Sequence, residues 1–192
     1  MNRLLPIAIA GGFALALSAA VASARDDSSL PSPSTFAFED IAGEWHILAH
    51  IPYFIERNRV APTIRFERRD DGKYDELFTA RKGSFDAKPK TFKQVTWAPD
   101  PARPWQLKTR LFFVIPARYS VLELDPTTGI ALLGTEKRDK AWIFSRSPTL
   151  DPASYLELLE RFEGMGFNKA SILRIPQSPA DLGKPGYAPI ER

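Results

Sequence analysis

The chain has 192 residues, of which 44% are hydrophobic and 26% are charged, and it contains no cysteine. This composition predicts one globular domain with a sizeable core, and it excludes disulfides, thiolate metal sites and thiol nucleophiles. The formal net charge is only +3, and basic residues are interleaved with acids, as in Arg68-Arg69-Asp70-Asp71. The sequence therefore lacks the basic stripe that is typical of nucleic-acid binding.

Residues 1–24 have the pattern of a secretory signal peptide. Arg3 gives a basic start, a mostly apolar run extends from Leu4 to Val21, and Ala22-Ser23-Ala24 is a small-x-small cleavage sequence. A transmembrane anchor is the alternative, but Pro6 and Gly11-Gly12 interrupt the apolar run. We therefore predict an exported protein, periplasmic or secreted. Because no cysteine is available for acylation, we expect no covalent membrane anchor, although transient membrane contact is compatible with the sequence.

The mature chain divides into three parts. Residues 25–35 are polar and proline-rich, which predicts a flexible leader. The folded domain is expected over residues 36–177. Residues 178–192 are rich in proline and glycine and have little apolar period, so a loose tail is expected.

The domain is expected to be all-β, because short segments of strand character alternate with turn signals such as Asp70-Asp71-Gly72. Even spacing of this kind is typical of an antiparallel barrel or sandwich rather than of βαβ units. Eight strands are predicted: Glu44 to Ile51, Thr63 to Arg68, Lys73 to Lys82, Thr91 to Ala98, Gln106 to Val114, Arg118 to Leu124, Gly129 to Glu136, and Lys140 to Arg146.

A single amphipathic helix should follow the last of these strands. Asp151 is its predicted cap and Pro152 its first residue, and apolar residues then recur at helical spacing at Tyr155, Leu158, Leu159 and Phe162. The apolar stripe needs a surface to cover, and the outside of a barrel, including Leu48, would supply one. Ile172 to Ile175 could then return as a short strand.

Four segments together resemble the lipocalins, and most closely the bacterial outer-membrane lipocalins and their apolipoprotein-D-like relatives. They are Phe38-Glu39-Asp40-Ile41-Ala42-Gly43-Glu44-Trp45, Tyr119 to Asp125, Arg138-Asp139, and Trp142 to Pro148. The similarity extends from about Phe36 to Gln177. It implies an eight-stranded up-and-down barrel, closed at the Trp45 end and open at the other, with the helix packed outside.

The same resemblance implies a floor for the barrel, made of Gly43, Trp45, Asp139 and Arg146. A glycine two residues before a tryptophan lets the backbone bend tightly where the sheet begins. A cation such as Arg146 lying across the Trp45 ring would contribute roughly 0.5 to 2 kcal/mol.

The open end and the lumen should hold the binding residues, because residues of a barrel strand alternate between inside and outside. If Trp45 points in, Ile47 and Ala49 should also point in, whereas His46, Leu48 and His50 should point out. The expected ligand-binding residues are Ile47, Ala49, Phe54, Leu107, Thr109, Leu111, Tyr119, Trp142 and Phe144. Ordinary core packing is the alternative role for these side chains. Residues 53–55 form either a lid or a patch for a partner.

No constellation in the sequence predicts catalytic or metal chemistry. His46 and His50 would be about 13 Å apart on a strand, too far for one metal ion, so both are expected to be surface histidines. Glu76 and Glu123 lie inside predicted strands and face water by default. We therefore expect no metal and no cofactor.

The sequence thus predicts an extracytoplasmic binding protein that takes a fatty acid, a lysophospholipid or a related lipid into its lumen, for lipid transport or membrane maintenance. Lys108, Arg118 or Lys140 could hold a head group at the rim. One alternative is a lipocalin-fold isomerase or hydratase acting on a lipid or terpenoid, which requires Glu76, Glu123 or Tyr119 to point inward beside a cavity. The other is a filled barrel used for protein contacts, which requires no cavity and an exposed patch at residues 53–55.

Overall fold

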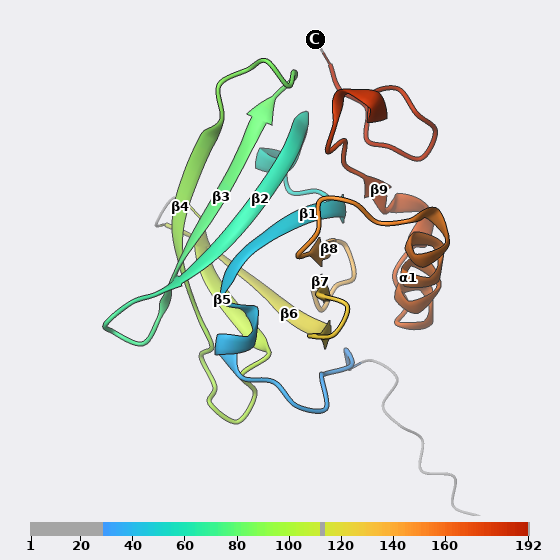
Figure 1. Ribbon diagram of the computed structural model, residues 1–192. Coiled ribbons are helices and arrows are strands. Elements are labelled where there is room, and N and C mark those ends of the chain that lie inside the picture. Colours follow the sequence, from blue (N-terminus) through green and yellow to red (C-terminus); the bar gives the residue numbers. More distant parts are fainter. Residues whose placement is uncertain (1–28, 112–113, 192) are drawn as a thin grey trace, which may run out of the picture.

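Eight antiparallel strands close into a barrel in the computed structural model, which describes residues 29–111 and 114–191 (Figure 1). The strands are β1 (Gly43–Ile51), β2 (Arg59–Arg68), β3 (Tyr74–Lys82), β4 (Lys90–Trp97), β5 (Gln106–Leu111), β6 (Ile115–Asp125), β7 (Ile130–Gly134) and β8 (Ala141–Ser145). Each pairs with its neighbour in the chain, and β1 pairs with both β8 and β2. The predicted up-and-down barrel is confirmed. The predicted signal peptide, residues 1–24, lies outside the described residues.

A ninth strand, β9 (Leu173–Arg174), lies where β1 and β2 diverge. It pairs with the second half of β1, and the Ile175 N–H donates to the Leu48 carbonyl at 2.8 Å. On the other side, the Ala61 N–H of β2 donates to the Pro176 carbonyl at 2.8 Å. The return strand predicted over residues 172–175 is therefore present, and it satisfies backbone groups that the splayed barrel strands leave unpaired.

The helix α1 (Pro152–Gly164) packs against the outside of the barrel, as predicted (Figure 1). Asp151 caps it by accepting a hydrogen bond from the Ser154 N–H at 2.9 Å. Its buried face belongs to an exterior apolar cluster, whose main members are Leu48, Ala49, Leu122, Leu132, Ile143, Tyr155, Leu158 and Phe162. Within residues 29–111 and 114–191, no helix combines the length and the apolarity needed to cross a membrane.

A β-bulge in β1 overturns the predicted alternation beyond Ile47. Ile47 pairs with Phe144, but the register then shifts so that Ala49 pairs with Ile143 and His50 with Trp142. Leu48 and Ala49 consequently both lie in the exterior cluster beneath α1. The prediction that Ala49 faces the lumen is wrong, because a bulge inserts one residue and exchanges the faces of all that follow. His50 is not a surface residue either, since it is only 4% exposed.

Residues 178–191 are not a loose tail. Two backbone hydrogen bonds hold this segment to Arg174. The Arg174 N–H donates to the Gly186 carbonyl at 3.0 Å, and the Ala188 N–H donates to the Arg174 carbonyl at 2.7 Å. Asn58 then exchanges two hydrogen bonds with the Glu191 backbone, at 2.9 and 3.0 Å. These partners lie far away in the sequence, so the proline and glycine content alone gave no sign of them. In the predicted leader, Leu30 also packs against the exterior cluster.

Candidate functional site

The floor of the barrel is built around Trp45, whose side chain is 2% exposed. Its indole N–H donates to the Ile41 carbonyl at 2.8 Å, and the guanidinium carbon of Arg146 lies 3.6 Å from the ring centre. Arg146 also donates to the carbonyls of Glu44 and Ala42, at 2.7 and 2.8 Å. The guanidinium thus ties the last barrel strand to the start of the first one across the narrow end of the lumen.

Asp139 does not belong to this floor. It lies in the turn between β7 and β8, where Thr135 Oγ1 donates to Asp139 Oδ1 at 2.8 Å. Arg146 follows β8, so the length of that strand separates the two residues. Successive turns of an up-and-down barrel alternate between its two ends. The prediction that groups Asp139 with Arg146 is therefore wrong, and Asp139 lies at the open end.

Inside the barrel, above the floor, lies a cavity of about 40 Å³. That is room for only a few water molecules. Its apolar lining consists mainly of Ile47, Ile64, Phe78, Leu133, Trp142 and Phe144. Its polar lining consists of Glu56, Glu76, Gln94, Thr109 and Tyr119, with Tyr53 and Ile55 at the mouth.

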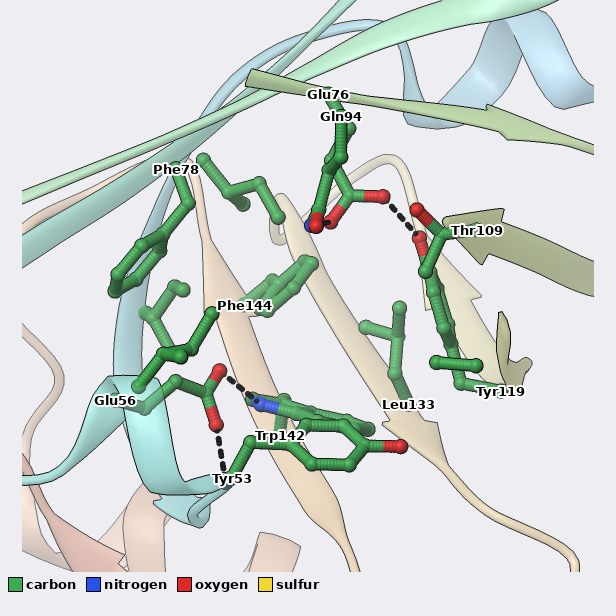
Figure 2. Close-up of a pocket in the computed structure, with 14 residues that line it drawn as sticks. Tyr53, Glu56, Glu76, Phe78, Gln94, Thr109, Tyr119, Leu133, Trp142 and Phe144 are labelled. Atoms are coloured by element: carbon green, nitrogen blue, oxygen red, sulfur yellow. Dashed lines mark hydrogen bonds between the residues drawn. The ribbon is translucent and has the colours of Figure 1, made fainter. Parts of the chain in front are cut away.

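Glu76 projects from the barrel wall beside the cavity (Figure 2), and it is 4% exposed. Its carboxylate accepts hydrogen bonds from Gln94 Nε2 and Thr96 Oγ1, and from the Tyr119 hydroxyl at 2.9 Å. Burial raises the pKa of Glu76, and the three donors oppose that rise. Burial, together with the neighbouring Glu76 charge, also holds the pKa of Tyr119 well above its usual range. Glu76 thus faces the lumen rather than water, whereas Glu123 lies outside and pairs with Arg161 at 3.1 Å.

A second carboxylate, Glu56, comes from the short 3-10 turn η2 (Phe54–Glu56) that covers the open end. Figure 2 shows it accepting a hydrogen bond from the Trp142 indole N–H at 2.8 Å and another from the Tyr53 N–H at 2.7 Å. The Tyr53 and Trp142 rings lie 5.7 Å apart. Burial raises the pKa of Glu56 to about 7, against the effect of both donors. The lid is therefore fastened to the barrel wall through one buried carboxylate.

His50 lies beside this lid carboxylate. Its Nδ1 is 3.9 Å from Glu56 Oε2, beyond hydrogen-bond distance, and has no partner among the described residues. Burial lowers the pKa of His50 to about 3, so the imidazole is neutral at pH 7. It therefore supplies no positive charge to Glu56.

The structure brings together five of the nine predicted ligand-binding residues. Ile47, Thr109, Tyr119, Trp142 and Phe144 line the cavity. Leu107 is buried in the interior apolar cluster without lining the cavity.

The other three predicted residues are placed differently. Ala49 lies in the exterior cluster, and Phe54 is 61% exposed because η2 turns its neighbours Tyr53 and Ile55, rather than Phe54, toward the cavity. Leu111 ends β5, and its side chain lies outside the described part of the chain.

The rim cations expected to hold a head group are also separated. The Lys140 ammonium lies 5.6 Å from the centre of the Tyr53 ring, at the mouth of the cavity. Lys108 packs over Trp97 at the same distance, on the face of β5 opposite Thr109, and Arg118 is exposed. Of the three, Lys140 is the one in contact with a residue that lines the cavity.

Glu56 and Gln94 are the polar lining residues that the sequence did not reveal. Glu56 lies in a turn, where no periodicity assigns a face, and Gln94 has its partner 18 residues away. For Glu76 a signal was present, because Tyr74, Glu76, Phe78 and Ala80 alternate along one buried face of β3.

Comparisons with known proteins agree with this architecture. A family model described as "Lipocalin-like domain" matches residues 37–177. The outer membrane lipoprotein Blc of Citrobacter freundii is 25% identical over 178 residues, which cover 93% of this chain and 99% of that protein. Blc of Escherichia coli K12 is 27% identical over 179 residues, covering 91% and 98%.

Solved structures show the same fold at low identity. Insecticyanin from the tobacco hornworm Manduca sexta superposes with a TM-score of 0.59 at 16% identity, covering 79% of this chain and 85% of that one. Lobster apocrustacyanin A1 gives a TM-score of 0.58 at 16% identity, covering 74% and 80%. At such identities the likeness concerns the fold alone.

Proposed function

Because the chain belongs to the lipocalin family, we propose that it binds one elongated hydrophobic molecule, such as a fatty acid, a lysophospholipid or a related lipid, inside its barrel. The observation that carries the proposal is the cavity between the Trp45 floor and the η2 lid, lined mainly by apolar and aromatic side chains. Affinity would come mostly from apolar burial, at about 25 cal/mol per Å² before the costs of association.

Ligand entry would require the lid to move. A cavity of about 40 Å³ is too small for a lipid chain, and the Tyr53 and Trp142 rings narrow it at the mouth. Tyr53 is only half-buried and directly precedes the three-residue turn η2, so its displacement would disturb little of the barrel. In this proposal, η2 swings away to admit the ligand, Trp142 repacks against the ligand, and η2 then closes over it so that Glu56 returns to the lid end of the cavity.

For its setting, we propose the cell envelope, where the protein would carry lipids or help to maintain the membrane. The sequence relatives are named outer membrane lipoproteins, and residues 1–24 have a signal-peptide pattern. Fractionation of cells that express the full chain, followed by N-terminal sequencing, would test this location. A cytoplasmic, unprocessed chain would contradict it.

Native mass spectrometry of the protein purified without detergent tests the binding proposal directly. We expect about one lipid per chain, to be identified after organic extraction, and uptake of the fluorescent probe N-phenyl-1-naphthylamine after delipidation. Trp142→Ala should weaken probe binding, whereas Trp97→Ala, on the opposite face from the buried Thr96, should not. A protein that is always empty and takes up no probe would contradict lipid binding.

A second candidate, a lipocalin-fold enzyme, is favoured by one observation. Glu76 and Tyr119 both point inward beside the cavity and share a hydrogen bond, and an acid–base isomerase or hydratase needs a titratable group in its lumen. Solvent deuterium incorporation into a bound lipid or terpenoid, abolished in Glu76→Gln, would support it. The filled-barrel alternative is weakened by the cavity itself and by Tyr53 and Ile55, which face it rather than forming an exposed patch.

A further inference from the structure

The lumen carries acidic groups without matching cations. Glu56 and Glu76 both line the cavity, and none of the described residues that line it is a lysine or an arginine. Two cations do contact the lid: Lys140 lies over the Tyr53 ring, and Arg59 donates to the Ile55 carbonyl at 3.1 Å. Neither of them lines the cavity. Among the described residues, all the hydrogen-bond donors to the two buried carboxylates are neutral, and the charge of Lys140 acts on Glu56 only from outside the cavity.

The two carboxylates differ in how much acceptor capacity they have left. Each carboxylate has about four lone-pair positions. Glu76 accepts three hydrogen bonds from side chains of the barrel wall, so its own surroundings nearly satisfy it. Glu56 accepts two, from Tyr53 and Trp142. Glu56 therefore keeps the greater capacity to accept a further hydrogen bond.

The position of Glu56 makes that capacity available to a ligand. The residue lines the cavity at its lid end, where Tyr53 and Ile55 mark the mouth. A polar head group that trailed an apolar chain into the barrel would come to rest at this level. His50 Nδ1, which has no hydrogen-bond partner in the described part of the chain, lies 3.9 Å from Glu56 Oε2 and adds a second polar atom beside the carboxylate.

We propose that the lumen selects single-chain amphiphiles whose head group donates hydrogen bonds and carries no negative charge, and that Glu56 accepts the donor. This inference rests on the proposed lipid binding and narrows its ligand class. A hydroxyl or ammonium group complements the carboxylates, whereas an ionised carboxylate would meet like charges in a poorly hydrated site. An ionised fatty acid would keep its head group outside, at the mouth.

The test is displacement of N-phenyl-1-naphthylamine at pH 8 by four ligands with the same twelve-carbon chain: dodecylamine, dodecanol, methyl dodecanoate and dodecanoate. The methyl ester corrects for chain burial, because it is neutral and cannot donate. We expect the amine and the alcohol to bind at least about tenfold more tightly than dodecanoate, with the ester between them. Equal binding of all four, or tighter binding of dodecanoate, would overturn the inference while leaving lipid binding intact.

Two substitutions test which of the two carboxylates determines the selectivity. Glu56→Gln should bring the amine-to-carboxylate affinity ratio close to one, and Glu76→Gln should reduce it less. Glu123→Gln, on the outside of the barrel, is the matched control and should leave the ratio unchanged. A ratio that persists in folded Glu56→Gln would overturn the assignment to Glu56. If the wild-type protein binds neither the probe nor any of the four ligands, the proposed function fails together with this inference.

Discussion

The indole N–H of Trp142 donates a 2.8 Å hydrogen bond to Glu56, and so joins the last barrel strand to the lid across 86 residues of sequence. Trp142→Phe would keep an aromatic ring at this place but remove the donor. We expect the variant to lose about 1–3 kcal/mol of unfolding free energy, because a buried carboxylate loses one of its two donors. Urea denaturation would measure the loss. Trp97→Phe, at a half-buried outer position, is the control and should change stability far less.

Glu56 should make stability depend on pH. Its pKa is about 7 in the folded protein against 4.5 for an ordinary glutamate. Between these values the folded protein holds a proton that the unfolded chain has released, so its unfolding free energy falls as pH rises from about 4.5 to 7. The full effect is on the order of 3 kcal/mol. Because Gln does not titrate, the unfolding free energy of wild type minus that of Glu56→Gln should fall by this amount between pH 4.5 and 8, as followed by urea denaturation. A difference that stays flat with pH would contradict the burial of Glu56.

His50 should act in the opposite direction. Its folded pKa is about 3 against 6.5 for an ordinary histidine, so the unfolded chain binds a proton that the folded protein does not. Stability is therefore lost as pH falls from about 6.5 to 3, by up to about 5 kcal/mol. Relative to wild type, His50→Gln should gain stability over this acid range. His46→Gln, in the same strand, is the control. An unchanged acid midpoint in His50→Gln would show that the imidazole is solvated.

Because of the bulge in β1, substitutions at two nearby residues should have different effects on stability and on probe binding. Ala49 is fully buried beneath α1, so Ala49→Leu should overpack the exterior cluster and cost about 1–3 kcal/mol without changing probe affinity. Ile47 lines the cavity, so Ile47→Ala should weaken probe binding. Thermal melts and probe titrations of the two variants separate these effects. Reversed outcomes would contradict the register of β1.

The floor should be a strong determinant of stability. Trp45→Ala removes a buried ring, the Arg146 contact and the hydrogen bond to Ile41, and should cost about 3–5 kcal/mol. Chemical denaturation would measure it. Trp97→Ala should cost about 1 kcal/mol, because Trp97 is only half-buried. Equal losses in the two variants would mean that Trp45 does not hold the floor.

The fold could be predicted because its determinants are local. Turn residues such as Asp71 and Gly72 end one strand and start the next, and Asp151 with Pro152 begins the helix. Alternation counted from Trp45 correctly placed Ile47 inside. Such signals depend on a few neighbouring residues, and here they agree with the global fold.

The polar part of the site depends on distant partners, which the sequence does not display. Glu76 is buried because donors 18, 20 and 43 residues away meet its carboxylate. Without them, the expectation that a carboxylate faces water is reasonable, even though its neighbours Tyr74 and Phe78 alternate inward. The prediction for Asp139 was wrong for another reason. A motif match placed it at the floor of the barrel, whereas the direction of the strands places it at the open end.

The extra residue in β1 also governs how pocket residues can be compared between this chain and any relative whose first strand lacks the bulge. An alignment that ignores it pairs Ala49 with lumen positions of an unbulged strand and His50 with surface ones. Beyond Leu48, a substitution read from such an alignment would then be assigned to the wrong face of the barrel wall. A gap placed at Leu48 restores the correspondence, and His50, which is buried beside Glu56, is then compared with inward-facing residues.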